Sequence, residues 1–179
     1  MHLQPLALAT PRLLIRHLQT ADVPALAAIL GDAQVMRYSV RGVLDERAVG
    51  EFVQNCMACY YADGFGPMAV VEVASAELIG FCGLNAEQVD GAREVEIGYR
   101  LSPRFWGKGF ATEAVEACLR HGFETLGLGS IIAIVQPENV ASVRVLHKAG
   151  FQDYVHSQYH RLGVRIYRMS GPQWRARHC

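Results

Sequence analysis

The segment from Arg104 to Glu113 has the residue types and spacing of a phosphate-binding turn. Gly107 and Gly109 lack a Cβ, so the backbone can turn sharply there and its N–H groups can approach an anion closely. A helix predicted to begin near Gly109 adds the partial positive charge of its N-terminus. A pyrophosphate fits such a turn. The segment is neither a phosphate loop ending in Gly-Lys-Ser/Thr nor a full Gly-x-Gly-x-x-Gly, because Ala111 and Thr112 follow.

Two carboxylates lie just upstream, on a strand predicted over residues 93–101. Alternation places Glu94 and Glu96 on one face of that strand, where they repel each other. Repulsion raises the pKa of at least one of them, which suits a general base. Glu96 is the better candidate because it lies closer to the glycine turn. A solvated strand face is the alternative interpretation.

Three blocks together resemble the GNAT superfamily of acyl-CoA-dependent N-acetyltransferases, namely Glu94–Leu101, Arg104–Glu113 and Asn139–Phe151. Within that superfamily the chain is most similar to the branch containing the ribosomal-protein N-terminal acetyltransferases. The resemblance runs from about residue 12 to about residue 169. It implies a mixed α/β fold in which one mostly antiparallel sheet carries helices on both faces, with a splayed strand at the acyl-CoA site.

The resemblance also implies which residues hold acetyl-CoA, the acyl-donor substrate. Main-chain amides of the turn would bind the CoA pyrophosphate, and the Leu101 backbone would pair with the pantetheine amides. Asn139 would bond the pantetheine arm, although it also fits an ordinary turn residue. The Lys108 side chain either contacts phosphate or points to solvent. The remaining cofactor-binding candidates are Arg104, Gly107, Gly109, Ala111 and Thr112.

The thiol that leaves CoA needs a proton donor. Many family members carry a tyrosine seven residues after the asparagine, but that position is Leu146 here. The resemblance therefore makes Ser142 the candidate that hydrogen-bonds the CoA sulfur. A helix-capping or first-turn serine is the equally weighted alternative.

The acceptor amine must be neutral to attack a thioester, which explains why a base is needed. An α-amino group has an ordinary pKa of about 8 and a lysine-type ammonium about 10.4, so a base of modest strength favours the α-amine. The acceptor-site candidates are Tyr38, in a segment that varies among relatives, and His160, near the last predicted turn. A protein N-terminus, a polyamine, an antibiotic or an amino acid all remain open as acceptors.

The predicted function is direct transfer of an acetyl group from acetyl-CoA to a primary amine, without a covalent enzyme intermediate. Glu96 and Ser142 are the predicted catalytic residues. A non-catalytic acyl-CoA-binding module is the alternative from another class of protein. Transfer of a longer acyl group such as succinyl is the alternative within the enzymes.

The elements that must position these residues alternate between helical and strand patterns, as in a mixed α/β protein. Capping residues and glycines punctuate the helices, and two final strands flank a turn predicted at Leu162-Gly163. The predicted strands cover residues 12–17, 68–73, 78–84, 93–101, 130–135, 153–159 and 164–169. The predicted helices cover residues 20–30, 45–60, 112–126 and 141–148.

Composition predicts one domain spanning residues 1–179, since 179 residues with 51% apolar content fill a single core. Seventeen basic and seventeen acidic residues cancel, so we expect neither nucleic acid nor membrane as a partner. We expect a cytoplasmic monomer or homodimer. We expect no metal site, because the seven histidines are dispersed along the sequence. The Cys56-x-x-Cys59 pair invites a metal or redox interpretation, but its helical, apolar setting favours core packing.

Overall fold

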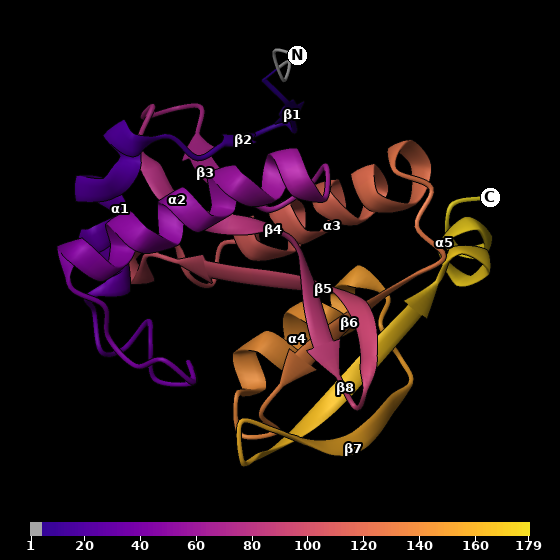
Figure 1. Ribbon diagram of the computed structural model, residues 1–179. Helices are drawn as coiled ribbons and strands as arrows, with labels where there is room; N and C mark the ends of the chain where they lie inside the picture. Colours follow the sequence, from indigo (N-terminus) through magenta and orange to yellow (C-terminus); the bar gives the residue numbers. More distant parts are fainter. Residues whose placement is uncertain (1–4) are drawn as a thin grey trace.

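The protein is described by a computed structural model that covers residues 5–179. Its strands form one twisted sheet in the order β1-β2-β3-β4-β5-β6-β8-β7 (Figure 1). Neighbouring strands pair antiparallel, except that β5 and β6 pair parallel. The strands are β1 (Ala7–Ala9), β2 (Leu13–His17), β3 (Pro67–Glu72), β4 (Leu78–Val89), β5 (Ala92–Leu101), β6 (Ser130–Val135), β7 (Tyr154–Tyr159) and β8 (Leu162–Ser170).

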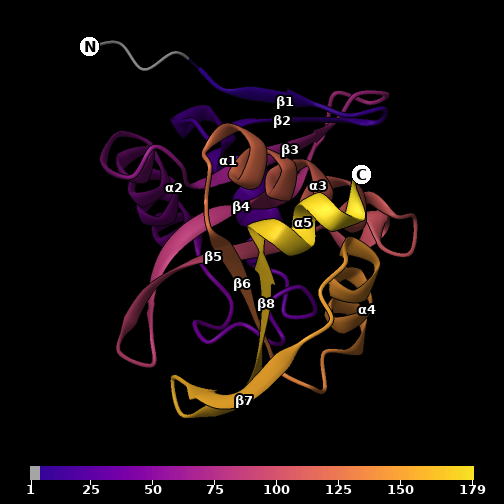
Figure 2. The same ribbon diagram turned by 90° about the vertical axis from the view of Figure 1, so that its right-hand side faces the viewer.

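Helices cover both faces of the sheet, which confirms the predicted fold class. Helices α1 and α2 pack together on one face, and α3 packs against β4 and β5. Figure 2 shows α1 and α2 on one side of the strands and α3 and α4 on the other. The helices are α1 (Val23–Leu30), α2 (Glu46–Ala62), α3 (Phe110–Arg120), α4 (Val140–Ala149) and α5 (Gly171–Arg177), with one-turn 3-10 helices at Thr20–Asp22 and Pro103–Phe105.

Local capping signals set most helix ends. The Asp45 side chain accepts a hydrogen bond from the Ala48 N–H at 2.8 Å and starts α2. Gly150 stops α4 in the left-handed region, at a φ of +103°. Helix α3 differs from the prediction. It begins at Phe110, and after Arg120 the chain widens into a π-helical turn over His121–Thr125.

Three features escape the sequence prediction. Strand β1 is a three-residue edge strand without β-branched residues, and only its pairing with β2 identifies it. Helix α5 starts with a capping box between Ser170 and Gln173. The predicted turn at Leu162-Gly163 is wrong, because both residues belong to β8. His160 and Arg161 make the turn with φ of +48° and +65°, the two positive values that a tight hairpin turn uses.

The sheet divides beside the core, and this division positions the site. Strands β4 and β5 pair from Val89↔Ala92 to Gly80↔Leu101. In contrast, β5 and β6 share only the Glu96↔Ile132 register. The half of β5 after Glu96 therefore separates from β6 and opens a gap in the sheet. This arrangement agrees with the splayed strand that the resemblance implies.

Three further features concern the cysteines, membrane-spanning helices and metal ligands. Cys56 is buried in the core on α2, and burial raises the pKa of its thiol to about 12, so it packs as predicted. Within residues 5–179, no helix is long and apolar enough to cross a membrane. Over the same described residues, no group of three or more His, Cys, Asp or Glu side chains is placed to hold a metal ion.

Candidate active site

The glycine turn connects the end of β5 to the start of α3, and its backbone has the conformation that the sequence predicts. Gly107 and Gly109 have φ of +71° and +81°, and Gly109 is the N-cap of α3. A Cβ added at Gly107 would meet no atom within 4 Å, and one at Gly109 would meet only Arg12 Nη2 at 3.4 Å. The turn thus faces open space, and the uncapped first N–H groups of α3 point toward it.

A hydrogen-bond network from the first strands fixes this turn, and sequence reasoning missed it. Arg12 donates from Nε to Glu113 Oε2 at 2.7 Å and from Nη1 to the Lys108 carbonyl oxygen at 2.9 Å. Thr10 donates from its hydroxyl to Glu113 Oε1 at 2.7 Å. Arg12 thereby neutralises the acidic side chain in the first turn of α3, where a bound phosphate would otherwise be repelled.

The two charged side chains of the turn, Arg104 and Lys108, make contacts within the protein. Arg104 forms an ion pair with Glu77 at 3.1 Å, so its side chain is directed away from the open face. Lys108 is exposed, with Nζ 5.7 Å from the centre of the Phe105 ring. Backbone amides of the turn are therefore the groups best placed for a phosphate. Ala111 and Thr112 lie partly buried in the first turn of α3.

The backbone of Leu101 is already engaged in part. It pairs with Gly80 of β4, and its carbonyl oxygen accepts a hydrogen bond from Trp106 Nε1 at 2.8 Å. Trp106 therefore has a structural role beside the turn. Pairing between the Leu101 backbone and pantetheine stays a prediction.

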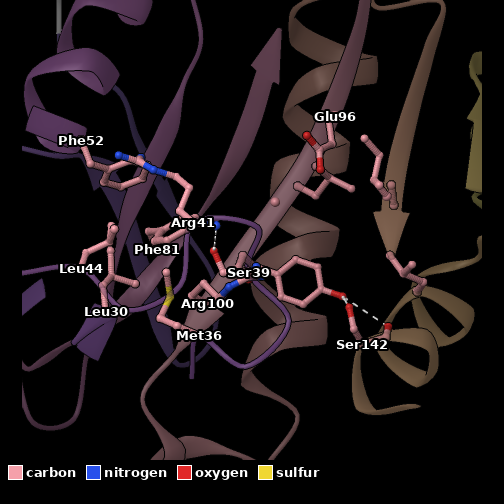
Figure 3. Close-up of a pocket in the computed structure, with 16 residues that line it drawn as sticks. Leu30, Met36, Ser39, Arg41, Leu44, Phe52, Phe81, Glu96, Arg100 and Ser142 are labelled. Carbon is pink, nitrogen blue, oxygen red and sulfur yellow. Dashed lines mark hydrogen bonds between the residues drawn. The ribbon is translucent and has the colours of Figure 1, made fainter. Parts of the chain in front are cut away.

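A cavity of about 190 Å³ lies at the gap between β5 and β6, and both α4 and the segment that joins α1 to α2 contribute to its lining (Figure 3). It brings together Glu96 and Ser142, the two predicted catalytic residues. The other residues that line it are Leu30, Met36, Ser39, Arg41, Leu44, Phe52, Phe81, Ile97, Gly98, Tyr99, Arg100, Ala133, Ile134 and Leu146.

Glu96 has the electrostatic setting of a base, though for a different reason than repulsion by Glu94. Burial and, to a lesser extent, the nearby Glu87 on β4 raise the pKa of Glu96 to about 7, although Arg100 opposes the shift. The predicted repulsion from Glu94 is wrong. That carboxylate pairs with Arg168 at 2.6 Å, and the hydrogen bond lowers its pKa.

Ser142 is hydrogen-bonded to a residue that sequence reasoning missed. The hydroxyl of Tyr99 lies 2.6 Å from Ser142 Oγ and donates to the Ser142 carbonyl oxygen at 3.3 Å. Burial raises the pKa of Tyr99 to about 12, so its phenol keeps its proton at neutral pH. Leu146 lines the same cavity with an apolar side chain. Tyr99 thus places a phenol beside Ser142 in the cavity that Leu146 also lines.

The side chain of Asn139 has a capping role. Its Oδ1 accepts the Ser142 N–H at 3.3 Å, which makes Asn139 the N-cap of α4. This bond holds Ser142 in the first turn of the helix and leaves its hydroxyl to Tyr99. Contact between Asn139 and pantetheine stays a prediction.

The two acceptor-site candidates lie outside the cavity lining. Tyr38 donates to the Glu138 carbonyl oxygen at 3.2 Å, while its neighbour Ser39 does line the cavity. His160 is exposed in the β7–β8 turn. Tyr159, one residue earlier, is partly buried, and burial together with the charges of Glu87 and Glu96 raises the pKa of its phenol.

Sequence reasoning also missed the aromatic part of the cavity lining. Phe52 and Phe81 pack with their ring centres 5.1 Å apart, and both line the cavity. The helical period of α2 indicated that Phe52 is on a packed face, but no local signal pairs it with Phe81. These side chains come from separate elements, so only the folded chain shows that they share a cavity.

Comparison with known proteins agrees with this geometry. Residues 12–152 match the acetyltransferase (GNAT) domain family. The uncharacterized N-acetyltransferase YoaA of Bacillus subtilis (strain 168) is 34% identical over 147 residues, 81% of this chain and 82% of YoaA. The uncharacterized N-acetyltransferase p20 of Bacillus licheniformis is 32% identical over 146 residues, 81% of this chain and 82% of its own.

Solved structures show the same fold. A GNAT-family acetyltransferase from Bacillus anthracis has a TM-score of 0.80 at 28% identity, covering 93% of this chain and 99% of its own. A ribosomal-protein alanine acetyltransferase from Vibrio fischeri has a TM-score of 0.77 at 16% identity, covering 94% and 98% of the two chains, a likeness of fold. These matches confirm the resemblance, and the chain belongs to the GNAT family of acetyltransferases.

Proposed function

We propose that this acetyltransferase moves an acetyl group from acetyl-CoA directly to a primary α-amine, with Glu96 as the general base. The observation that carries the proposal is the position of Glu96. Its carboxyl, with a pKa raised to about 7, lines the same cavity as the Tyr99–Ser142 hydrogen bond. A proton acceptor and a hydroxyl pair thus flank one space at the open end of β5.

The pKa of Glu96 matches the proton that it must accept. At pH 7 an α-amine with a pKa near 8 costs about 1 kcal/mol to deprotonate, against about 4–5 kcal/mol for a lysine-type amine. A carboxylate at its ordinary pKa would be a poor acceptor for either amine. Glu96, with a pKa of about 7, is thus better suited to an α-amine than to a lysine-type amine.

Other groups of the chain would hold the donor and stabilise the leaving thiolate. The amides around Gly107 and Gly109 would bind the pyrophosphate, which the open space at that turn permits. The Tyr99 and Ser142 hydroxyls would donate to sulfur as negative charge develops there. No cysteine of residues 5–179 lines the cavity, which favours direct transfer over a thioester formed on the enzyme.

A panel of amines and peptides tests this function. Amine-dependent release of CoA from acetyl-CoA, with a mass gain of one acetyl group on an α-amine, is the expected result. Succinyl-CoA in parallel tests the alternative of a longer acyl group. Comparison of an α-amine with the side-chain amine of an N-blocked lysine tests the acceptor class. Failure of every amine to release CoA, with a folded enzyme that binds CoA, would refute the proposal.

A further inference from the structure

The charges around the cavity indicate what the acceptor carries besides its amine. Among the described residues, the lining includes one carboxylate, that of Glu96, and two guanidinium groups, those of Arg41 and Arg100. Such a balance opposes further positive charge on an acceptor and attracts negative charge. A polyamine, which brings several ammonium groups, is thus the less favourable acceptor.

Arg100 is the better placed of the two cations. It follows Glu96 by four residues on β5, and both residues line the cavity. Its Nη1 donates to the Tyr99 carbonyl oxygen at 2.9 Å. In the part of the chain that the structure describes, the ion pairs use other arginines and leave Arg100 without a carboxylate partner. A partly buried guanidinium with spare donors is suited to a carboxylate.

The segment between α1 and α2 adds polar groups to the same side. Ser39 Oγ accepts the Arg41 N–H at 3.3 Å, which leaves its hydroxyl proton free to donate. Figure 3 shows Ser39 and Arg41 beside the strand that carries Glu96 and Arg100. Arg41 also has no carboxylate partner among residues 5–179. Ser39 and Arg41 line the cavity together with Arg100, so the lining carries further donors for an anion.

The opposite part of the lining is apolar. Leu44, Phe52 and Phe81 contribute one aliphatic and two aromatic side chains, and Figure 3 shows Leu44 and Phe52 well apart from Glu96. An acceptor that fills this part has an apolar group of its own. The cavity therefore has three chemically distinct regions, for an amine, an anion and an apolar side chain.

We infer that the acceptor is a small amino acid with an apolar side chain, whose carboxylate binds Arg100 while its amine lies at Glu96. This rests on the proposed function and narrows its acceptor. A free amino acid carries amine, carboxylate and side chain on one carbon, whereas a protein N-terminus has no carboxylate there. The volume of about 190 Å³ also lies below the roughly 300–1,000 Å³ of pockets for larger ligands.

Matched acceptors test the inference on the unmodified enzyme. We compare L-phenylalanine with L-phenylalaninamide, 2-phenylethylamine, a phenylalanine-initiated peptide amide and spermidine, using acetyl-CoA release and mass shift. We expect kcat/KM for the amino acid to exceed that for its amide at least tenfold, the effect of one charge-assisted hydrogen-bonded contact. The amide has the less basic amine, so intrinsic reactivity would favour the opposite order. L-Methionine and its amide provide a second pair.

Variants then locate the carboxylate. Arg100→Gln should reduce the acid-over-amide preference at least tenfold, and Arg100→Lys should retain part of it. Arg37→Gln is the matched control, because Arg37 belongs to the same segment as Arg41, is exposed and lies outside the lining. Equal or better use of the amide, peptide or spermidine overturns this inference and leaves the proposed function standing. An unchanged preference in Arg100→Gln overturns the role of Arg100, and no transfer to any amine defeats both.

Discussion

Replacing Glu96 with glutamine tests the proposed base through two independent measurements. The first is the pH dependence of turnover. With a pKa of about 7, Glu96 is roughly one tenth ionised at pH 6 and nine tenths at pH 8, so kcat should rise about tenfold over that range and then level off. Glu96→Gln should lose about 10²–10⁴-fold at pH 7, the usual effect of removing a general base.

The residual rate of the variant depends on the amine alone. An α-amine with a pKa near 8 increases its neutral fraction about fiftyfold between pH 6 and pH 8. The wild-type rate rises only about tenfold in the same interval, so the defect should shrink about fivefold. A defect of constant size at every pH would mean that Glu96 positions a group rather than accepting a proton.

The second measurement is stability. The folded pKa of about 7 exceeds the ordinary value of 4.5, so the folded protein binds a proton between these values that the unfolded chain releases. The free energy of unfolding therefore falls as the pH rises from about 4.5 to 7. Glutamine removes this penalty, and Glu96→Gln should be about 1–3 kcal/mol more stable than the wild type at pH 8, with no gain at pH 4. Urea unfolding at both pH values measures the difference.

Glu94→Gln is the matched control, since it makes the same change two residues away on the same face. Arg168 lowers the pKa of Glu94, so this carboxylate stabilises the fold above its ordinary pKa and loses that effect as the pH falls. The pair is partly exposed, and Glu94→Gln should cost at most about 1 kcal/mol at pH 8. Activity should change little. If both variants show the same sign of stability change, the assigned environment of Glu96 is wrong.

Four further substitutions test the donor side. Gly109→Val should weaken CoA binding at least tenfold by calorimetry, because a β-branched residue is strained at a φ of +81° and blocks close phosphate approach; unchanged affinity in a folded variant would place the phosphates elsewhere. Arg12→Ala should reduce the rise in melting temperature that CoA causes, since Glu113 then carries an uncompensated charge; an equal rise contradicts the role of Arg12. Tyr99→Phe and Ser142→Ala should each lower kcat by up to about tenfold. Because the two hydroxyls act as a pair, the double variant should be little slower than the slower single variant. Additive losses would mean that the two hydroxyls act independently.

The sequence predicted those parts of the site that depend on local conformation. Gly107 and Gly109 need positive φ, which few other residues adopt, so the two glycines, together with the flanking strand and helix patterns, indicated the turn. Gly150 likewise marks the end of α4. Glu96 and Ser142 became candidates because each lies within a motif of its own segment. Such signals can be recognised from the sequence because they depend only on residues that are neighbours in the chain.

Partners that meet through space could not be predicted in the same way. Arg12 and Glu113 are 101 positions apart, and Tyr99 and Ser142 are 43 apart. Their contact depends on the register of β2, β3, β4 and β5, which one sequence does not specify. The assignment of Glu94 as the repelling neighbour failed for this reason, because the register places Glu87 opposite Glu94 and diagonal to Glu96, whose pKa it raises.

Strict alternation also failed where the sheet divides. It placed Tyr99 on the face opposite Glu96, yet both side chains line the cavity. Beyond Glu96, β5 has no partner in β6, and side chains from either face can reach the gap.

The position of the turn at His160 also could not be predicted from local residue types. Glycine at position 163 is the stronger local turn signal, but the pairing of β7 with β8 puts the turn at His160 and Arg161.

The division of the sheet reconciles two opposing needs of a carboxylate base. Glu96 must lose water for its pKa to rise, but it must also be reachable by an amine. At the last register shared with β6, it gains burial from both neighbouring strands, while the gap immediately beyond admits the acceptor. Farther along β5, the Arg100 side chain donates a hydrogen bond to the main-chain carbonyl oxygen of Tyr99. The Trp106 side chain donates one to that of Leu101. Pairing with β4 as far as Gly80↔Leu101 keeps β5 extended along this open edge, and the base stays beside an accessible space.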